Sequence, residues 1–202
     1  MLPRLYPILD LDLCRERRLD PLAVLDAFLA GGARFLQLRD KTISTAERLR
    51  SADTIVARAH AAGAHVIVND RADIAVLTGA AGVHVGQDDL PVEDVRRIVG
   101  PGAIVGLSTH DEAQIEAAAR TSATYIAVGP IYGTSTKDTG YSARGLELIR
   151  RAVLVGRPVV AIGGITLARA PEVFSAGAAS VAVISDLLRD DPAEMVRLFR
   201  DV

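Results

Sequence analysis

The sequence contains very little cysteine and no tryptophan, and it lacks any long apolar run. Cys14 is the single cysteine among 202 residues, so an internal disulfide is excluded and a reducing cytoplasm is the expected compartment. No apolar stretch approaches the roughly 20 residues of a membrane-spanning helix. Proline and aspartate interrupt the first segment of the chain, which is not typical of a signal peptide.

Neither sign of charge dominates the chain, because 23 basic residues oppose 25 acidic ones and give a formal net charge of −2. This balance argues against the broad electrostatic footprint that nucleic acids or anionic membranes require, although a local basic pocket is compatible with it. Half of the residues are hydrophobic, which provides material for a sizeable core and disfavours global disorder. We therefore expect neither a nucleic-acid partner nor a membrane partner.

Short apolar segments alternate with amphipathic ones along the whole chain. Eight segments are strand candidates, at residues 5–9, 35–38, 65–68, 82–85, 104–107, 125–128, 159–162 and 180–183, and most of them are continuously apolar, as buried parallel strands are. Helical signals occupy residues 21–30, 44 to about 63, a short stretch after 70, and residues 91–99, 111–120, 143–155, 167–176 and 192–199. Eight strand–helix units favour an α/β fold, a single (β/α)8 TIM barrel over residues 1–202, with a doubly wound open sheet as the alternative.

Polar and small residues collect at the end of almost every predicted strand, which is where the active site of a barrel lies. Three of them, Arg39, Lys41 and Lys137, are cations suited to an anionic ligand, although each alone is compatible with ordinary surface charge. A glycine pair at 163–164 follows the seventh strand, and Ser185 follows the eighth. Many barrels bind a phosphate at these two loops, whereas a tight turn without a ligand is the alternative.

Two aspartates follow adjacent predicted strands, Asp70 after the third and Asp89 after the fourth. Facing carboxylates suit Mg²⁺, which often shares its oxygen ligands with substrate phosphates. Asp88 could replace Asp89, and a general acid–base pair is the other use of two carboxylates. The nearby cations favour the metal–phosphate interpretation.

No histidine has metal-ligand spacing with another histidine or with Cys14, which disfavours zinc. Core or surface roles are the default expectation for His60, His65 and His84. His110 differs because it lies at a predicted strand end. The hydroxyl-rich segment 134–137 lacks the glycine spacing of a P-loop. The surrounding loop, residues 129–140, is either a lid over the site or an irregular surface connection.

Six short motifs follow one another along nearly the whole chain. They are Gln-Leu-Arg-Asp-Lys at 37–41, Val-Asn-Asp-Arg at 68–71, Gly-Gln-Asp-Asp-Leu-Pro at 86–91, Gly-Leu-Ser-Thr-His at 106–110, Gly-Pro-Ile-Tyr at 129–132 with Thr-Ser-Thr-Lys at 134–137, and Ile-Gly-Gly-Ile at 162–165. Together they closely resemble the thiamine-phosphate synthase family. Two departures are Gly133, where many relatives have proline, and Leu9 before Asp10, where relatives more often have threonine.

The resemblance implies a transferase of thiamine biosynthesis, built on a (β/α)8 barrel, with one Mg²⁺ per subunit held by Asp70 and Asp89. Contacts to the substrate 4-amino-2-methyl-5-(diphosphooxymethyl)pyrimidine would come from Gln37, Arg39, Lys41, Asn69, Ser108 and Lys137. Contacts to the second substrate, a thiazole phosphate with or without a carboxyl group, would come from Thr134, Ser135, Thr136, Gly164, Ile184 and Ser185. The expected catalytic residues are Arg39, Lys41, Lys137 and Ser108.

The implied substrates favour a dissociative substitution. Loss of diphosphate leaves a cation that is delocalised into the electron-rich aminopyrimidine ring, and the thiazole nitrogen then attacks. Such a reaction needs a neutralised leaving group and a dry site more than it needs a general base. Two other functions stay open: a thiazole tautomerase of the sister family, with His110 as acid–base, and a non-catalytic barrel that binds a phosphorylated ligand. The partners are expected to be small molecules, and a homo-oligomer is compatible with the sequence.

The resemblance generates a prediction for Lys137. The change Lys137→Ala should lower turnover far more than it lowers affinity for the thiazole phosphate, because the lysine is assigned to the diphosphate leaving group. Steady-state kinetics together with thiazole-phosphate binding measures both effects. Equal loss of turnover and of thiazole-phosphate affinity would remove Lys137 from the diphosphate site.

Overall fold

The computed structural model describes residues 2–134 and 140–202, and eight parallel strands within them close into a barrel. In chain order the strands are β1 (Leu5–Asp10), β2 (Phe35–Arg39), β3 (His65–Asn69), β4 (Gly82–Val85), β5 (Ile104–Thr109), β6 (Tyr125–Val128), β7 (Val159–Ile162) and β8 (Ser180–Val183). The barrel closes where β1 pairs with β8, with Leu5 opposite Val181 and Pro7 opposite Val183. This closing pair confirms the (β/α)8 barrel and excludes the open sheet.

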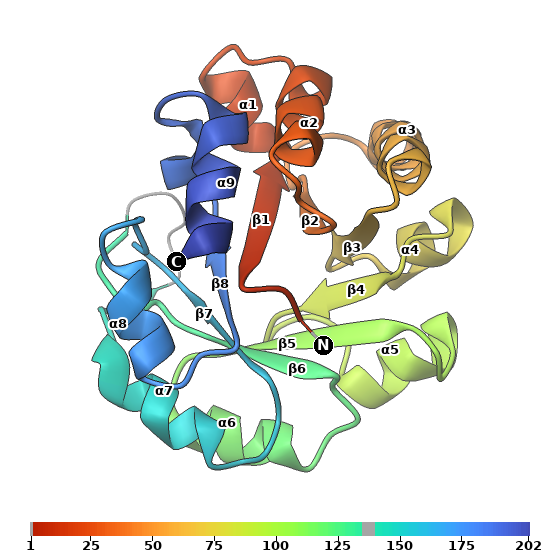
Figure 1. The fold of residues 1–202 in the computed structure, drawn as a ribbon. Helices are drawn as coiled ribbons and strands as arrows, with labels where there is room; N and C mark the ends of the chain where they lie inside the picture. The colour runs from red at the N-terminus through yellow and green to blue at the C-terminus, as the bar shows by residue number, and fades with distance from the viewer. Residues whose placement is uncertain (1, 135–139) are drawn as a thin grey trace.

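Helices surround the ring of strands, as Figure 1 shows, with α9 beside the strands that close the barrel. In chain order they are α1 (Leu11–Glu16), α2 (Pro21–Ala30), α3 (Thr45–Ala61), α4 (Ala72–Thr78), α5 (Val92–Val99), α6 (Glu112–Ala119), α7 (Gly145–Val153), α8 (Ala170–Ser175), the 3₁₀ helix η1 (Ser185–Leu188) and α9 (Pro192–Asp201). The predicted capping box of α3 is present, since Ser44 and Glu47 each bond the other's backbone N–H. The sequence does not predict α1 or η1, because both are short and follow strands almost directly.

Two predicted helices begin later than expected. The predicted helix over 143–155 begins at Gly145, whose left-handed φ of 71° prevents the helical backbone from extending to the residues before it. The N–H groups of Arg144 and Gly145 donate to the carbonyl oxygens of Pro130 and Ile131, which holds this helix start against the loop after β6. The predicted helix over 167–176 begins at Ala170, and the preceding turn is held by the Leu167 N–H, which donates to Asp186 Oδ2 at 3.0 Å.

Side chains from the strands form two apolar layers, because successive side chains along a strand point to opposite faces. The barrel interior is filled by Tyr6, Ile8, Phe35, Ile67, Tyr125, Ala127, Val160 and Ala182. The larger layer lies between the strands and the surrounding helices and includes Leu9, Leu36, Val83 and Phe199. The interior layer is therefore a packed plug beneath the strand ends, and it forms the floor on which a site at that rim rests.

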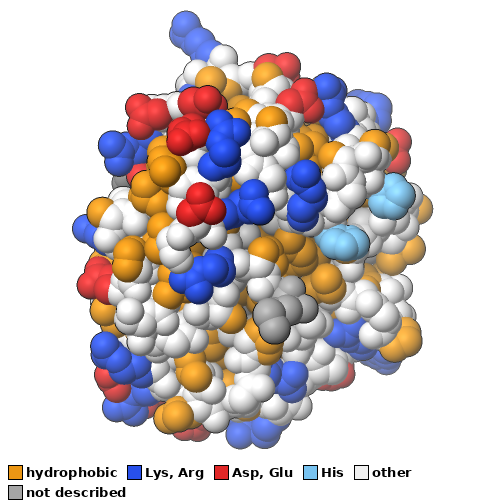
Figure 2. Space-filling view, in the orientation of Figure 1, with side chains coloured by type: hydrophobic (Ala, Val, Ile, Leu, Met, Phe, Trp, Pro, Cys, Tyr) orange, Lys and Arg blue, Asp and Glu red, His pale blue; other side chains and the backbone are white. Residues whose placement is uncertain are grey.

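Charged groups of both signs are mixed on the face that Figure 2 shows, with apolar side chains between them. This mixture agrees with the near balance of basic and acidic residues in the sequence. Within residues 2–134 and 140–202, no helix combines the length and apolar character that crossing a bilayer demands.

The tight approach of β4 to β5 generates a stability prediction. A Cβ atom at Gly82 would lie 1.9 Å from the carbonyl oxygen of Ile104, a backbone atom that cannot rotate away. We expect Gly82→Ala to lower the free energy of unfolding by about 3 kcal/mol. Gly102→Ala is the matched control, because nothing lies within 4 Å of its added Cβ. Urea unfolding measures both variants, and equal stabilities would contradict the barrel packing described here.

Candidate active site

The carboxyl ends of the strands surround a cavity of about 290 Å³. Every described residue that the sequence assigns to the pyrimidine diphosphate or to Mg²⁺ lines this cavity, namely Gln37, Arg39, Lys41, Asn69, Asp70, Asp89 and Ser108. These residues come from the ends of β2 to β5 and the loops that follow. Lys137, the remaining assignment, lies outside the described residues.

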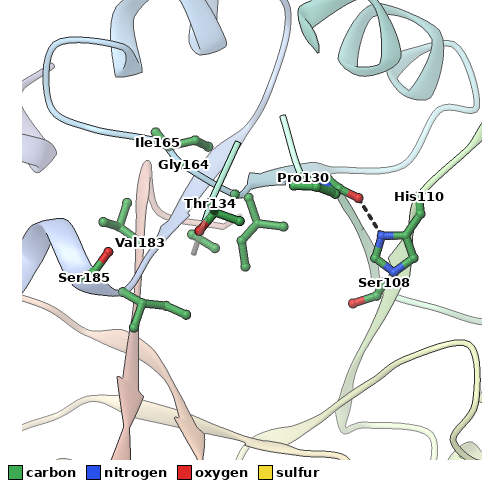
Figure 3. Close-up of a pocket in the computed structure, with 13 residues that line it drawn as sticks. Ser108, His110, Pro130, Thr134, Gly164, Ile165, Val183 and Ser185 are labelled. Atoms are coloured by element: carbon green, nitrogen blue, oxygen red, sulfur yellow. Dashed lines mark hydrogen bonds between the residues drawn. The ribbon is translucent and has the colours of Figure 1, made fainter. Parts of the chain in front are cut away.

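A second, smaller cavity of about 90 Å³ lies at the ends of β6 to β8. Its lining includes the described residues that the sequence assigns to the thiazole phosphate, Thr134, Gly164, Ile184 and Ser185. Figure 3 shows Ser108 and His110 on one side of this cavity, with Gly164, Ile165, Val183 and Ser185 across from them. Ser135, Thr136 and the central part of the predicted lid over 129–140 lie outside the described residues.

The two cavities adjoin, because five residues line both of them: Ser108, His110, Ile162, Ala182 and Ile184. Three of these are apolar, and the other two, Ser108 and His110, are polar. A ligand in the larger cavity would therefore meet a ligand in the smaller one across a largely apolar junction. Such a junction brings reacting atoms together while limiting the access of water.

The loops after β6 and β7 are joined backbone to backbone. The N–H of Ile131 donates to the carbonyl of Ile162 at 2.9 Å, and the N–H of Tyr132 donates to that of Gly163 at 3.0 Å. Gly163 and Gly164 both have left-handed φ angles, 97° and 62°. An added Cβ at Gly163 would lie 2.5 Å from the Cβ of Pro130. The glycine pair is therefore required by loop packing, and it also leaves the backbone open to a ligand.

The two aspartates predicted to hold a metal lie close together. Asp70 directly follows β3 in a left-handed conformation with φ 63°, which is uncommon for a residue with a side chain, and its N–H donates to the carbonyl of His84 at 2.7 Å. Asp89 accepts a 2.7 Å hydrogen bond from the N–H of Gly86. Burial, together with the neighbouring carboxylate of Asp70, raises the pKa of Asp89 above its ordinary value.

The pair of carboxylates fits a cation that takes most of its ligands from elsewhere. Lys41 Nζ lies 3.0 Å from Asp70 Oδ2, so one carboxylate is already paired with a positive charge. Among the described residues, no group of three or more histidine, cysteine, aspartate or glutamate side chains could hold a metal. Mg²⁺ commonly binds through one or two carboxylates together with waters and substrate phosphates. Asp70 and Asp89 therefore suit Mg²⁺ bound with a phosphorylated ligand rather than a metal caged by protein.

Donor groups of the larger cavity are held in place or left unused. Arg39 Nη1 lies 2.5 Å from Asp10 Oδ2, and the Arg39 side chain is only 14% exposed. The Nδ2 atom of Asn69 is buried and has no hydrogen-bond partner among the described residues. A buried donor without a partner is uncommon in a folded protein, and a ligand that accepts its hydrogen bond would remove the cost. Asn69 therefore marks a position where a polar ligand atom fits.

A chain of hydrogen bonds runs beneath the larger cavity. Gln37 Nε2 donates to the hydroxyl of Tyr6 at 3.2 Å, and that hydroxyl lies 3.0 Å from the hydroxyl of Tyr125. The chain continues from Tyr125 to His84 Nδ1 at 3.0 Å, and from His84 Nε2 to Ser108 Oγ at 2.8 Å. The barrel interior thus connects two predicted substrate contacts, Gln37 and Ser108, through three residues that the sequence does not assign to the site.

His84 is the clearest of these missed residues, because the sequence analysis assigns it only a core or surface role. The structure places His84 in the wall of the larger cavity. The sequence contains a usable signal, since Val83 and Val85 pack outward against the helices, and period-two alternation then points His84 into the barrel. Tyr6 and Tyr125 follow the same rule on β1 and β6.

His110 lies at the junction of the two cavities. Its Nδ1 atom is 2.5 Å from the carbonyl oxygen of Gly129, and its ring stacks on Tyr141 with centroids 4.4 Å apart. A carbonyl oxygen only accepts hydrogen bonds, so Nδ1 carries the proton and Nε2 is the basic nitrogen of the neutral ring. The Arg144 guanidinium lies 4.9 Å from the centre of the Tyr141 ring and extends this stack.

Fold and site together define a class: a (β/α)8 barrel whose rim joins cations, paired carboxylates and a glycine loop around two adjoining cavities. The family described as Thiamine monophosphate synthase matches residues 5–187, and the chain belongs to this family. It is 43% identical over 199 residues to a protein named thiamine-phosphate synthase from Roseiflexus castenholzii, covering 98% of this chain and 86% of that one. It is 45% identical over 179 residues to a Chlorobium luteolum protein of the same name, covering 88% of this chain and 84% of the relative.

A solved structure supports the same assignment. The chain resembles a thiamine phosphate pyrophosphorylase from Pyrococcus furiosus with a TM-score of 0.87 and 32% sequence identity, covering 98% of this chain and 94% of that one. A 3-hexulose-6-phosphate synthase is similar with a TM-score of 0.71 at 19% identity, covering 98% of each chain, and this likeness shows the fold alone.

Proposed function

We propose that the protein is a thiamine-phosphate synthase. It joins 4-amino-2-methyl-5-(diphosphooxymethyl)pyrimidine to a thiazole phosphate and releases thiamine phosphate and diphosphate. The observation that carries this proposal is the pair of adjoining cavities, one with cations and carboxylates and the other at the glycine loop. The similar proteins from Roseiflexus castenholzii and Chlorobium luteolum, both named thiamine-phosphate synthase, support it.

Each substrate has one cavity in this proposal. The larger cavity takes the pyrimidine diphosphate through Gln37, Arg39, Lys41, Asn69 and Ser108. The smaller cavity takes the thiazole phosphate through Thr134, Gly164, Ile184 and Ser185. The family resemblance alone assigns Lys137 to the first substrate, and Ser135 and Thr136 to the second. The family resemblance supports these roles, as does the shared lining of the described residues.

Asp70 and Asp89 would hold one Mg²⁺ at the diphosphate. When bound there, the ion supplies positive charge that stabilises the departing diphosphate. Lys41 pairs with Asp70 at 3.0 Å, which keeps this lysine at the same place. Lys41 and Arg39 therefore add their charges where negative charge develops on the leaving group.

The reaction breaks the bond between the methylene carbon and the diphosphate oxygen, and the electron pair leaves with diphosphate. The positive charge that forms on the methylene carbon is delocalised into the aminopyrimidine ring. The thiazole nitrogen then donates its electron pair to that carbon. Holding both reactants in adjoining cavities contributes up to roughly 7–11 kcal/mol to lowering the barrier. The apolar side chains of Ile162, Ala182 and Ile184 at the junction exclude water from the cation.

The tautomerase alternative rests on His110 alone. A tautomerase has no need of paired carboxylates, or of the two cations Arg39 and Lys41 in the same cavity. A barrel that only binds a phosphorylated ligand has no need of a second adjoining cavity. The synthase reaction uses all of these features, and we therefore prefer it.

The setting of the reaction follows from the same proposal. The partners are small molecules, and residues 1–202 act as one catalytic domain. Cys14 is buried and unpaired, and burial raises the pKa of its thiol to about 11, so the cysteine is inert. A cytoplasmic location agrees with this reduced thiol, and assembly into a homo-oligomer is compatible with the proposal.

The direct test of the proposed function is an assay of the purified protein. With both precursors and Mg²⁺ present, we expect thiamine phosphate and diphosphate to form in equal amounts, measured by mass spectrometry and by diphosphate release. Conversion of a thiazole phosphate isomer without the pyrimidine would support the tautomerase instead. Binding of both ligands without product would support the non-catalytic barrel.

The metal assignment predicts different effects at two neighbouring aspartates. Asp89→Ala should lower Mg²⁺-dependent turnover by about 100-fold or more while the protein stays folded, because one of two carboxylate ligands is lost. Asp88, the alternative ligand, also lines this cavity, but it is exposed and Asp70 acts on Asp89, so Asp88→Ala should retain most of the turnover. Chelation of Mg²⁺ should abolish turnover of the unchanged protein. Turnover of Asp89→Ala at the unchanged level would remove the metal from this position.

A further inference from the structure

The junction between β1 and α1 places a carboxylate against the cation Arg39 of the larger cavity. Asp10 ends β1, and its side chain caps α1 by accepting a 3.0 Å hydrogen bond from the N–H of Leu13. The other oxygen of Asp10 contacts Arg39 Nη1 at 2.5 Å. Asp10 is only 4% exposed, so this ion pair is largely shielded from water. One residue thus joins the start of α1 to the guanidinium.

Asp12 lies in α1, two residues after Asp10, and it holds the backbone that follows Arg39. Its Oδ2 accepts a 2.9 Å hydrogen bond from the N–H of Lys41. Its Oδ1 accepts from Arg15 Nη2 at 2.6 Å and from the hydroxyl of Thr42. A single side chain therefore fixes two consecutive residues of the loop that carries Lys41. Asp12 Oδ2 also lies 3.8 Å from Arg39 Nη1.

Arg15 completes the attachment of this loop to α1. Its Nη2 atom donates to Asp40 Oδ1 at 2.7 Å and to the Thr42 hydroxyl at 3.0 Å. Asp40 is buried, so the loop is held from inside as well as at its surface. Partial burial by itself would raise the pKa of Asp12, but the hydrogen bonds from Thr42 and from the Lys41 amide, together with Arg15, lower it. Asp12 is therefore in its charged form near neutral pH.

We propose that Asp12 is a positioning residue for the diphosphate subsite. It holds the Lys41 amide and the Thr42 hydroxyl of the loop that follows Arg39, so that Arg39 and Lys41 present their charges to the leaving group in one arrangement. The inference rests on the proposed function, because the diphosphate subsite is part of it. Asp12 lies in α1, outside every motif that carries the family resemblance.

The physical reason is preorganisation. Arginine and lysine side chains are long, and ordering each of them on binding costs entropy. A loop already held by α1 has less freedom to lose when the diphosphate binds. The guanidinium has five N–H donors, so its Nη1 contact with Asp10 leaves others for phosphate oxygens. The same contacts limit the freedom of the two cations to adopt unproductive positions in the absence of substrate.

The test compares two changes at Asp12 with a matched control. Asp12→Ala removes every contact of the carboxylate, whereas Asp12→Asn keeps one oxygen that can accept from the Lys41 amide. Asp26→Ala is the control: Asp26 also pairs with an arginine, Arg58, through two 2.7 Å hydrogen bonds, but that pair lies on the exposed surfaces of α2 and α3. The measurements are kcat, KM for each substrate, and affinity for inorganic diphosphate with Mg²⁺ by calorimetry.

We expect Asp12→Ala to raise KM for the pyrimidine diphosphate and to weaken inorganic diphosphate binding, each by about 10- to 100-fold. KM for the thiazole phosphate should stay within about twofold, because the other cavity is not changed. Asp12→Asn should recover part of the loss, and Asp26→Ala should match the unchanged protein. Equal loss for both substrates, or no recovery in Asp12→Asn, would overturn the positioning role and leave a general structural one.

A double-mutant cycle with Lys41→Ala tests whether Asp12 acts on diphosphate binding through Lys41. If Asp12 acts through the loop cation, Asp12→Ala should cost less diphosphate affinity in the Lys41→Ala background than in the unchanged protein. Strictly additive losses would contradict the inference. Failure of the unchanged protein to bind diphosphate and to turn over would overturn the proposed function, and this inference with it. Normal diphosphate binding by both the unchanged protein and Asp12→Ala would overturn the inference alone.

Discussion

Closure of the sheet between β1 and β8 is the constraint on which the site depends. Because every strand pairs in parallel with its neighbour, all eight carboxyl ends lie at the same rim. Residues far apart in sequence, such as Gln37 and Ser185, thereby reach one pair of adjoining cavities. The interior plug of aromatic and aliphatic side chains supports this rim from below. An open sheet built from the same units would bring only part of these strand ends together.

Charge pairing is the second constraint, and it acts within the rim. Arg39 is matched by Asp10, and Lys41 is matched by Asp70. A chain with a net charge of −2 can therefore carry a local anion site without a broad basic surface. Cations held by carboxylates are also cations with few alternative positions. An anionic ligand therefore binds to cationic side chains that need little rearrangement.

Much of the fold could be predicted from sequence, because buried parallel strands are continuously apolar and their order fixes which residues reach the rim. The positions of Asn69, Asp70 and Ser108 at the rim could be predicted in this way. The attachment of α1 to the loop after β2 could not be predicted, because Asp12 and Lys41 are 29 positions apart in sequence and no turn signal indicates the helix. Pairing of that kind depends on the closed barrel, which places β1 beside β2 in a fixed register. The roles of motif residues 135–137, which lie outside the described part of the chain, stay predictions.

The relay of hydrogen bonds under the larger cavity connects the Ser108 hydroxyl to the barrel interior. Its one directed link is at Gln37, whose amide nitrogen donates to the Tyr6 hydroxyl. The two tyrosine hydroxyls and the two ring nitrogens of His84 can each donate or accept, so the tautomer of His84 sets the direction of the links between Tyr125 and Ser108. With the His84 hydrogen on Nε2, Ser108 Oγ accepts within the relay and its own hydrogen is available to an oxyanion. A buried imidazole thus governs which hydrogen-bonding role the serine hydroxyl offers at the rim.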